Sequence, residues 1–220
     1  MIQVKRKQRE GIRSSFGTME LSHLEWMIIC SFFPEGKNIT IKEIQIQERV
    51  DYSYERVNTA LKSLTKKKIV KEEQKGKTLV YSLDFDNLYA KTGFSHYMME
   101  REIEFIKKHK IVYNAIKEIR DNPYIWGIVL FGSYSKGTET KQSDVDLICI
   151  SNKKEETEHF VKSLRYKYNI NFVPVVLPLH EFPNIKKDNP ELWNDLKMYG
   201  IAFKGGDYFY PWMYKNEKGN

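Results

Sequence analysis

Two short polar stretches decide how the second half of this 220-residue chain folds: Phe131-Gly132-Ser133-Tyr134-Ser135-Lys136-Gly137 and Ser143-Asp144-Val145-Asp146-Leu147. An apolar run, residues 125–131, leads into the first stretch, and another, residues 145–150, continues the second. Nearly continuous apolar runs of this length are typical of strands that are covered on both faces. The pattern therefore predicts a strand, a tight polar bend and a second strand.

The remainder of the second half predicts a small mixed sheet with helices packed against it. We expect an amphipathic helix over residues 155–168 and a short helix over 190–199, with strands over 170–177 and from 201 to 204. Strands alternating with helices in this way indicate an α/β (α+β) domain, and its expected range is 121–220.

A long connecting helix is predicted over residues 86–120. Apolar residues recur there at helical spacing among many charges, and Pro123 ends the pattern because proline disfavours helical geometry in the residue before it. The apolar positions are Phe105, Ile106, Val112, Tyr113, Ile116 and Ile119.

Residues 18–85 predict three helices followed by a hairpin. Thr40 and Glu43 form a capping box for the second helix, which ends near Val50, and Ser53 can cap the third. Two strands, 69–73 and 78–83, flank a turn with Gly76 at its tip. This order of elements is that of a winged helix-turn-helix, so the chain is expected to have two domains.

The third helix and the hairpin present a polar, basic surface that fits double-stranded DNA. Val57, Leu61 and Leu64 form the packing stripe of that helix, which leaves its opposite face to solvent or a ligand. A solvated helix face and a protein-contact module are the alternative interpretations. The residues predicted to contact DNA are Ser53, Arg56, Asn58, Thr59, Lys62, Lys66, Lys75 and Lys77.

Positive charge is concentrated towards the N-terminus, which favours a polyanion as the partner of that part. The formal net charge is +7, with 16 basic against 11 acidic side chains in residues 1–85 and 20 against 18 in the rest. Residues 1–17 are interpreted as a basic N-terminal arm, which either follows the DNA backbone or serves as a solvated tail.

The composition indicates a cytoplasmic protein without a membrane partner. Apolar residues make up 41% and charged residues 30%, and no apolar run reaches the roughly 18–20 residues of a membrane-spanning helix. Cys30 and Cys149 have no Cys or His neighbour at ligand spacing, and the five histidines are scattered. We therefore expect neither a disulfide nor a zinc site.

The bend at Gly132 is suited to a phosphate. Because glycine has no Cβ, an anion can approach its backbone, where the Ser133 hydroxyl and the N–H groups of the next turn can bind it. Lys136 can add a positive charge. The predicted nucleotide-binding residues are Gly132, Ser133, Lys136 and Ser143, although Gly-Ser and Ser-Asp pairs beside strands also occur in ordinary turns.

Asp144 and Asp146 are two residues apart on a strand, so both side chains leave on the same face, roughly 7 Å apart at the Cα atoms. Two carboxylates so placed repel each other, and a divalent cation is the natural compensation. Such a pair can hold Mg²⁺ for phosphoryl transfer. Asp144 and Asp146 are therefore the predicted metal ligands and catalytic residues.

These residues together resemble the signature of the polymerase-β nucleotidyltransferase superfamily, and are most similar to its minimal members, some of which follow a winged helix. The resemblance covers residues 121–206 and, less specifically, residues 18–85. It implies that Gly132 and Ser133 contact nucleotide phosphates. It also implies metal binding by the two aspartates and transfer of a nucleoside monophosphate from a nucleoside triphosphate to a hydroxyl, with pyrophosphate leaving.

The family pattern calls for a third acidic residue on a later strand, and the matching position here is Asn171. A neutral amide can bind a cation but cannot readily take the proton of an attacking hydroxyl. Glu181 is the nearest acid downstream, but it follows the end of the predicted strand and is a poor substitute.

Three functions are consistent with these patterns. The first is a DNA-binding, Mg²⁺-dependent nucleotidyltransferase that uses a nucleoside triphosphate, expected to be ATP, on an unknown acceptor. The second is a transcriptional regulator whose transferase-like domain binds nucleotide or dimerises without catalysis, which Asn171 favours. The third is a toxin–antitoxin-type modifier of a partner protein.

Two further features concern assembly. The connecting helix could form a homodimer, which would let paired winged helices read half-sites about one DNA turn apart. Aromatic residues near the C-terminus could stack on bases, although packing against the last strand or a partner subunit is the commoner use. They are Tyr208, Phe209, Tyr210, Trp212 and Tyr214.

Overall fold

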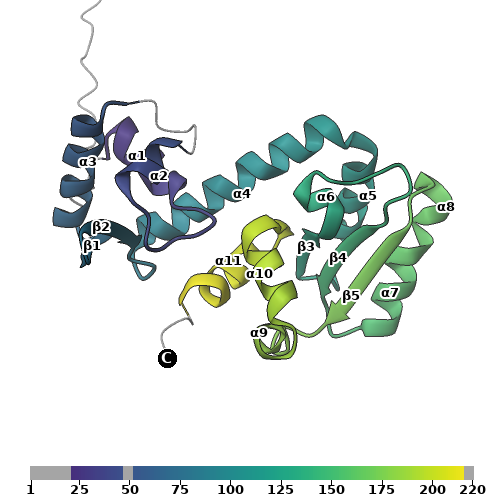
Figure 1. Ribbon diagram of the computed structural model, residues 1–220. Coiled ribbons are helices and arrows are strands. Elements are labelled where there is room, and N and C mark those ends of the chain that lie inside the picture. Colours follow the sequence, from purple (N-terminus) through teal and green to yellow (C-terminus); the bar gives the residue numbers. More distant parts are fainter. Residues whose placement is uncertain (1–20, 47–51, 216–220) are drawn as a thin grey trace, which may run out of the picture.

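The computed structural model describes residues 21–46 and 52–215, which form two groups of elements joined by a long helix (Figure 1). The predicted basic arm, residues 1–17, and the predicted end of the second helix near Val50 lie outside the described residues. Within the described ranges, no helix is both long enough and apolar enough to cross a membrane.

The N-terminal group has three helices and an antiparallel hairpin, in the predicted order. The elements are α1 (His23–Ser31), α2 (Ile41–Ile46), α3 (Tyr54–Lys66), β1 (Val70–Lys75) and β2 (Thr78–Leu83). Val57, Leu61 and Leu64 are fully buried, which confirms the predicted packing stripe of α3. The polar face of α3 and the hairpin remain at the surface.

The starts of α2 and α3 differ in how they are capped. Thr40 and Glu43 form the predicted capping box: the Thr40 N–H donates to Glu43 Oε2 at 2.7 Å, and the Glu43 N–H donates to Thr40 Oγ1 at 3.2 Å. Ser53 is the N-cap residue of α3, as predicted, but its side chain makes no capping hydrogen bond. The helix begins instead on the backbone bond from the Val57 N–H to the Ser53 carbonyl, 3.1 Å.

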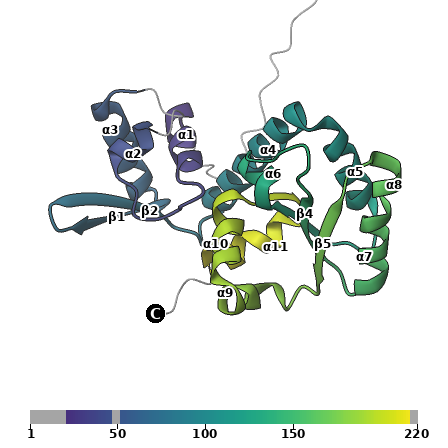
Figure 2. The ribbon, with the colours of Figure 1, turned by 45° about the vertical axis from the view of Figure 1, so that its right-hand side comes forward.

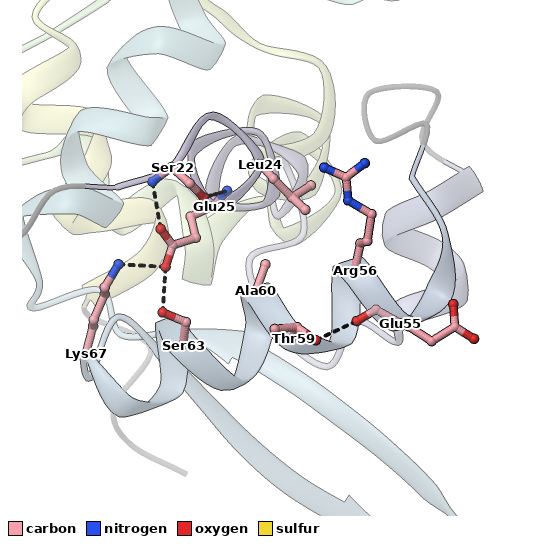
Figure 3. Close-up of a pocket in the computed structure, with 9 residues that line it drawn as sticks. All are labelled: Ser22, Leu24, Glu25, Glu55, Arg56, Thr59, Ala60, Ser63 and Lys67. Carbon is pink, nitrogen blue, oxygen red and sulfur yellow. Dashed lines mark hydrogen bonds and ion pairs between the residues drawn. The ribbon is translucent and has the colours of Figure 1, made fainter.

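Glu25 is a buried carboxylate between α1 and α3 (Figure 3). Its Oε2 accepts from the Ser22 N–H at 2.7 Å, and its Oε1 accepts from Ser63 Oγ at 2.8 Å and Lys67 Nζ at 2.6 Å. Burial by itself raises the pKa of the Glu25 carboxyl, but these bonds outweigh it and lower the pKa to about 2. The ionised carboxylate therefore holds the two helices together.

The predicted connecting helix is two helices, α4 (Leu88–Lys108) and α5 (Lys110–Asp121). His109 leaves helical geometry, with φ −130° and ψ 50°. The His109 N–H still donates to the Phe105 carbonyl at 2.8 Å, and the His109 carbonyl accepts from the Tyr113 N–H at 2.9 Å. Its ring packs against the ring of Phe105, one turn earlier, at 4.8 Å and against the ring of Tyr134 at 5.2 Å. As a result α4 runs from the N-terminal group to the sheet, whereas α5 folds back against the sheet (Figures 1 and 2).

A four-stranded mixed sheet forms the centre of the C-terminal group, with strand order β5-β4-β3-β6. The strands β3 and β4 are antiparallel, β3 and β6 are antiparallel, and β4 and β5 are parallel. The crossover between β4 and β5 is made by two helices where one was predicted. The bounds are β3 (Gly127–Phe131), β4 (Val145–Ile150), α7 (Lys154–Ser163), α8 (Arg165–Tyr168), β5 (Phe172–Leu177) and β6 (Ile201–Lys204).

Helices cover both faces of this sheet, as the apolar runs predicted. Ile128 and Leu147 are buried on the face that packs against α5 and α7. Val129 and Ile148 are buried on the opposite face, beneath a second set of helices. That set comprises η1 (Phe182–Asn184), α9 (Ile185–Asp188), α10 (Pro190–Tyr199), α11 (Gly206–Tyr210) and the π-helical segment η2 (Pro211–Lys215).

Three of the aromatic residues near the C-terminus, Phe209, Tyr210 and Tyr214, are buried, whereas Tyr208 is exposed, and the two buried tyrosines join the two groups of elements. The Tyr210 hydroxyl donates to the Phe85 carbonyl at 3.1 Å, and the Tyr214 hydroxyl donates to the Pro34 carbonyl at 3.0 Å. The Tyr214 ring also lies 5.4 Å from the ring of Phe33, which directly follows α1 and Phe32. The two groups therefore share one hydrophobic core.

Replacing Glu25 by glutamine is expected to destabilise the protein by about 2 kcal/mol at neutral pH, because it removes the buried charge that Lys67 pairs with. The folded pKa lies below the usual value of 4.5, so this stability is present above pH 4.5 and is lost as the pH falls towards 2. Urea unfolding of wild type and Glu25→Gln between pH 7 and pH 2 measures the difference.

Glu43→Gln is the matched control, since Glu43 belongs to the same kind of capping box but is exposed and lacks the bonds to a second helix. We expect it to cost less than about 1 kcal/mol. Equal losses for the two variants would show that the link between α1 and α3 contributes nothing.

Candidate functional site

The strands β3 and β4 bring the two polar stretches together at one end of the sheet. Phe131 at the end of β3 pairs with Asp146 in β4, and the chain then enters the short helix α6 (Gly132–Lys136). Gly132 has φ +71°, a left-handed conformation that glycine adopts without strain. A Cβ added at Gly132 would overlap with Asp146 Oδ2, so the carboxylate lies directly over the glycine bend.

Asp144 and Asp146 lie at the start of β4, where their charges act on each other. Burial raises the pKa of the Asp146 carboxyl, and the negative charge of Asp144 raises it further. Among the residues that the structure describes, no Lys or Arg forms an ion pair with either carboxylate. The two charges are therefore uncompensated by the protein, as is expected where a cation binds.

Asn171 lies beside this pair, immediately before β5. Its Nδ2 donates to Asp144 Oδ1 at 2.9 Å, and its backbone carbonyl accepts from the Val145 N–H at 2.9 Å. The residue matched to the third acidic position thus contacts the first carboxylate. Glu181 follows the opposite end of β5, and a strand of six residues spans about 20 Å, so Glu181 cannot take the place of Asn171.

The donor atoms at this site suit Mg²⁺. Carboxylate and amide oxygens are hard ligands, and Mg²⁺ is commonly held by one or two carboxylates together with substrate phosphates. Within residues 21–46 and 52–215, no group of three or more His, Cys, Asp or Glu side chains could hold a metal ion. A cation at Asp144 and Asp146 would therefore complete its coordination with phosphate oxygens or water.

The other predicted nucleotide-binding residues lie on the bend and in the loop after it. The Ser133 carbonyl accepts from the Thr138 N–H at 3.0 Å, which closes the turn after α6. Ser143 Oγ accepts from the Thr140 N–H at 2.9 Å, so this hydroxyl serves the turn that leads into Asp144. Both serines therefore make the contacts of an ordinary turn, which was the alternative interpretation of these residues. Their contacts with a phosphate stay a prediction.

Lys136 faces helix α10 in the structure. Its Nζ lies 2.6 Å from Asp195 Oδ2 and 5.4 Å from the centre of the Tyr199 ring. Sequence reasoning missed Asp195, because an acidic residue on the polar face of an ordinary amphipathic helix carries no motif. A nucleotide phosphate would have to compete with Asp195 for the Lys136 ammonium.

The residues predicted to contact DNA gather on α3 and on the hairpin. Seven of the eight are exposed and Asn58 is half-buried. The Arg56 guanidinium stacks on Tyr52 at 4.6 Å, and Lys75 Nζ donates to Asn38 Oδ1 at 2.8 Å. Arg56 and Thr59 also border a cavity of about 450 Å³ between α1 and α3 (Figure 3). Contact of these residues with a duplex backbone stays a prediction.

Comparison with known proteins identifies both halves of the chain. Residues 112–199 match the nucleotidyltransferase domain family, and residues 21–121 match the penicillinase repressor family. The first part of the chain is thus similar to a repressor domain, and the second part is similar to a nucleotidyltransferase domain. The resemblance drawn from the glycine bend and the paired aspartates is therefore confirmed, and so are the winged helix and the α+β fold class.

Two individual proteins are similar to part of this chain. A protein of Methanocaldococcus jannaschii named "putative protein adenylyltransferase" is 31% identical over 90 residues, which make up 37% of this chain and 60% of that protein. The chain thus spans less than two thirds of that relative. A crystal structure described as a toxin–antitoxin with AMP-PNP is 21% identical, covers 48% of this chain and 86% of its own, and superimposes with a TM-score of 0.35.

Gly132→Ala and Gly137→Ala form a matched pair that tests the contact between the bend and Asp146. Both glycines have positive φ, +71° and +69°. A Cβ at Gly132 meets the Asp146 carboxylate, whereas a Cβ at Gly137 meets no described heavy atom within 4 Å. We expect Gly137→Ala to cost about 1 kcal/mol of stability and Gly132→Ala about 2–4 kcal/mol.

Thermal unfolding of the two variants measures this difference, and a Mg²⁺–ATP titration of each shows whether the site survives. Gly137→Ala is expected to bind as wild type does, and Gly132→Ala is expected to lose binding. Equal stability losses with intact binding in both variants would mean that Asp146 does not rest on the bend.

Proposed function

We propose that the nucleotidyltransferase domain binds a nucleoside triphosphate with Mg²⁺ and transfers the nucleoside monophosphate to an acceptor hydroxyl, while the winged helix holds the protein on double-stranded DNA. The observation that carries the proposal is the pair of carboxylates, Asp144 and Asp146, which no described Lys or Arg pairs with and of which Asp146 lies against the glycine bend at Gly132. The match to the nucleotidyltransferase family over residues 112–199 supports it.

In this proposal Asp144 and Asp146 hold the metal, and Gly132 and Ser133 receive the triphosphate through the backbone of the bend. Bound Mg²⁺ would offset the charge of the phosphates at the reacting centre. The acceptor oxygen forms a bond to the α-phosphorus, the bond from the α-phosphorus to the bridging oxygen breaks, and pyrophosphate leaves. Asn171 cannot accept the hydroxyl proton, so the proton passes to water, and turnover is slow.

ATP as the nucleotide and a protein as the acceptor are supported by the Methanocaldococcus relative, whose name is that of a protein adenylyltransferase. This acceptor class corresponds to the third interpretation of the sequence, a modifier of a partner protein. A homodimer remains a prediction, and the exposed Leu88, Met99 and Ile103 of α4 would supply apolar surface for it.

A second candidate function is a regulator that binds nucleotide without transferring it. The hydrogen bond from Asn171 Nδ2 to Asp144 Oδ1 favours this candidate, because a neutral amide occupies the position from which a base would act. Binding of a metal and triphosphate needs Asp144 and Asp146 but no base. The two candidates therefore share the binding site and differ in chemistry.

Titration calorimetry with ATP, GTP, CTP and UTP tests the shared site. We expect ATP to bind only with Mg²⁺, and Asp144→Asn to weaken binding by about 100-fold, since it removes one charged ligand. Asp188→Asn is the control, because Asp188 is an exposed acid of α9 outside the site. Metal-independent binding, or unchanged binding by Asp144→Asn, would rule out the site.

Label transfer from α-labelled ATP distinguishes the two candidates. We expect Asn171→Asp, which restores a third carboxylate, to raise transfer by about 100-fold over wild type. Asn169→Asp adds the same charge two residues earlier and should leave the rate unchanged. Metal-dependent ATP binding with no transfer by wild type or Asn171→Asp would leave the regulator as the function.

A further inference from the structure

Arg101 of α4 links the nucleotide bend to the helix that carries the DNA-binding domain. One guanidinium nitrogen, Nη2, donates to the Ser135 carbonyl at 3.0 Å, and the other, Nη1, donates to the Met198 carbonyl at 3.3 Å. Ser135 is buried in α6, directly after the bend, and Met198 lies in the last turn of α10. One side chain thus reaches from α4 to both helices that flank the site.

The two carbonyls that Arg101 contacts are groups that a helix leaves without an internal partner. The last four carbonyls of any helix lack an intrahelical donor, and that end carries the negative pole of the helix dipole. Ser135 is the penultimate residue of α6, and Met198 is the penultimate residue of α10. A guanidinium presents several donors in a rigid fork and stays charged at any physiological pH, so it suits two such carbonyls at once.

Arg101 also contacts Tyr97, which lies one turn earlier on the same helix and packs against the N-terminal group. The Arg101 Nη1 donates to the Tyr97 hydroxyl at 3.4 Å, and the Arg101 guanidinium lies 5.8 Å from the centre of the Tyr97 ring. Tyr97 is buried and stacks on Phe33 at 5.8 Å, next to the end of α1. Arg101 is therefore in a continuous series of contacts from the bend to the DNA-binding domain.

A second series of contacts runs parallel to the first. Lys136, the last residue of α6, pairs with Asp195 of α10, and Lys197 of the same helix lies over the Tyr214 ring at 5.3 Å. The Tyr214 hydroxyl donates to the Pro34 carbonyl beyond α1. Both series of contacts end on the segment Phe33–Pro34. A shift of α6 would therefore displace the same part of the winged helix through either series.

We propose that Arg101 is a positioning residue. From α4 it holds the bend at Gly132 in position, and it thereby links nucleotide binding to the DNA-binding domain. The inference rests on the proposed nucleotide site and adds its regulation. Linkage of this kind is reciprocal, so a nucleotide that tightens the contacts of Arg101 changes the affinity for DNA by the same factor as DNA changes the affinity for nucleotide.

Hydrogen exchange of the full chain, with and without saturating Mg²⁺–ATP, tests the proposal. In wild type we expect ATP to slow exchange about fivefold or more in a peptide covering residues 27–36, at the end of α1, although this peptide does not contact the site. In Arg101→Gln we expect about tenfold weaker ATP binding and, at matched saturation, loss of the slowing in that peptide.

Two further variants control the experiment. Arg165 lies at an exposed position on α8, and its guanidinium lies over the ring of Tyr166. Arg165→Gln removes the same charge there and should behave as wild type. Arg101→Lys keeps the charge but loses the fork, and it provides the comparison if Arg101→Gln does not fold.

The outcomes separate the proposal from the function on which it rests. Two outcomes would overturn the role of Arg101 and leave the nucleotide site standing. In the first, wild type binds Mg²⁺–ATP but residues 27–36 are not protected from exchange. In the second, their protection persists in Arg101→Gln and Arg101→Lys. A lower melting temperature with unchanged ATP binding and unchanged protection would make Arg101 merely structural. Failure of wild type to bind Mg²⁺–ATP would remove the proposed function and the linkage together.

Discussion

The close approach of the Asp146 carboxylate to the backbone of Gly132 is the contact on which the site depends. A side chain at position 132 would occupy the space of that carboxylate, so the left-handed bend and the acid have to occur together. The same contact buries Asp146 enough to raise its pKa, and Asp144 adds a second charge nearby. The protein thus keeps an electrostatic repulsion that the fold does not relieve, and a metal with its triphosphate would relieve it.

The aromatic segment formed by α11 and η2 decides how the two domains are related. Domains joined by a single helix usually move independently, but Tyr210 and Tyr214 bond to carbonyls of the N-terminal group and share its core. Separating the two groups of elements would expose these rings to water and break both hydrogen bonds, and the loss of apolar burial is costly. The geometry between the bend and the winged helix is therefore defined, and a contact such as that of Arg101 can transmit a change.

Much of this arrangement could be predicted from local sequence patterns. The helix over 190–199, the strand over 201–204 and the two buried strands follow from periodicity, because their residues face either core or solvent consistently. The break at His109 could not be predicted, since Phe105, Val112 and Ile116 keep one helical stripe across it. The contact of the His109 ring with Tyr134 joins residues 25 positions apart, which local periodicity does not show. The C-terminal helices were missed because their aromatic residues follow neither the helical nor the strand period. The ion-pair partner of Lys136 was missed because it lies 59 residues away in the sequence.

Asn171 shows how a single neutral residue can separate binding from chemistry at such a site. The Asn171 amide lies close enough to Asp144 to donate a hydrogen bond to it. Two carboxylates at the same positions would repel each other unless a proton or a cation lay between them. The amide therefore makes the site more stable without metal and less able to accept a proton. In the function that we propose, this exchange would be useful, because a nucleotide that is turned over slowly would remain bound long enough to act as a signal.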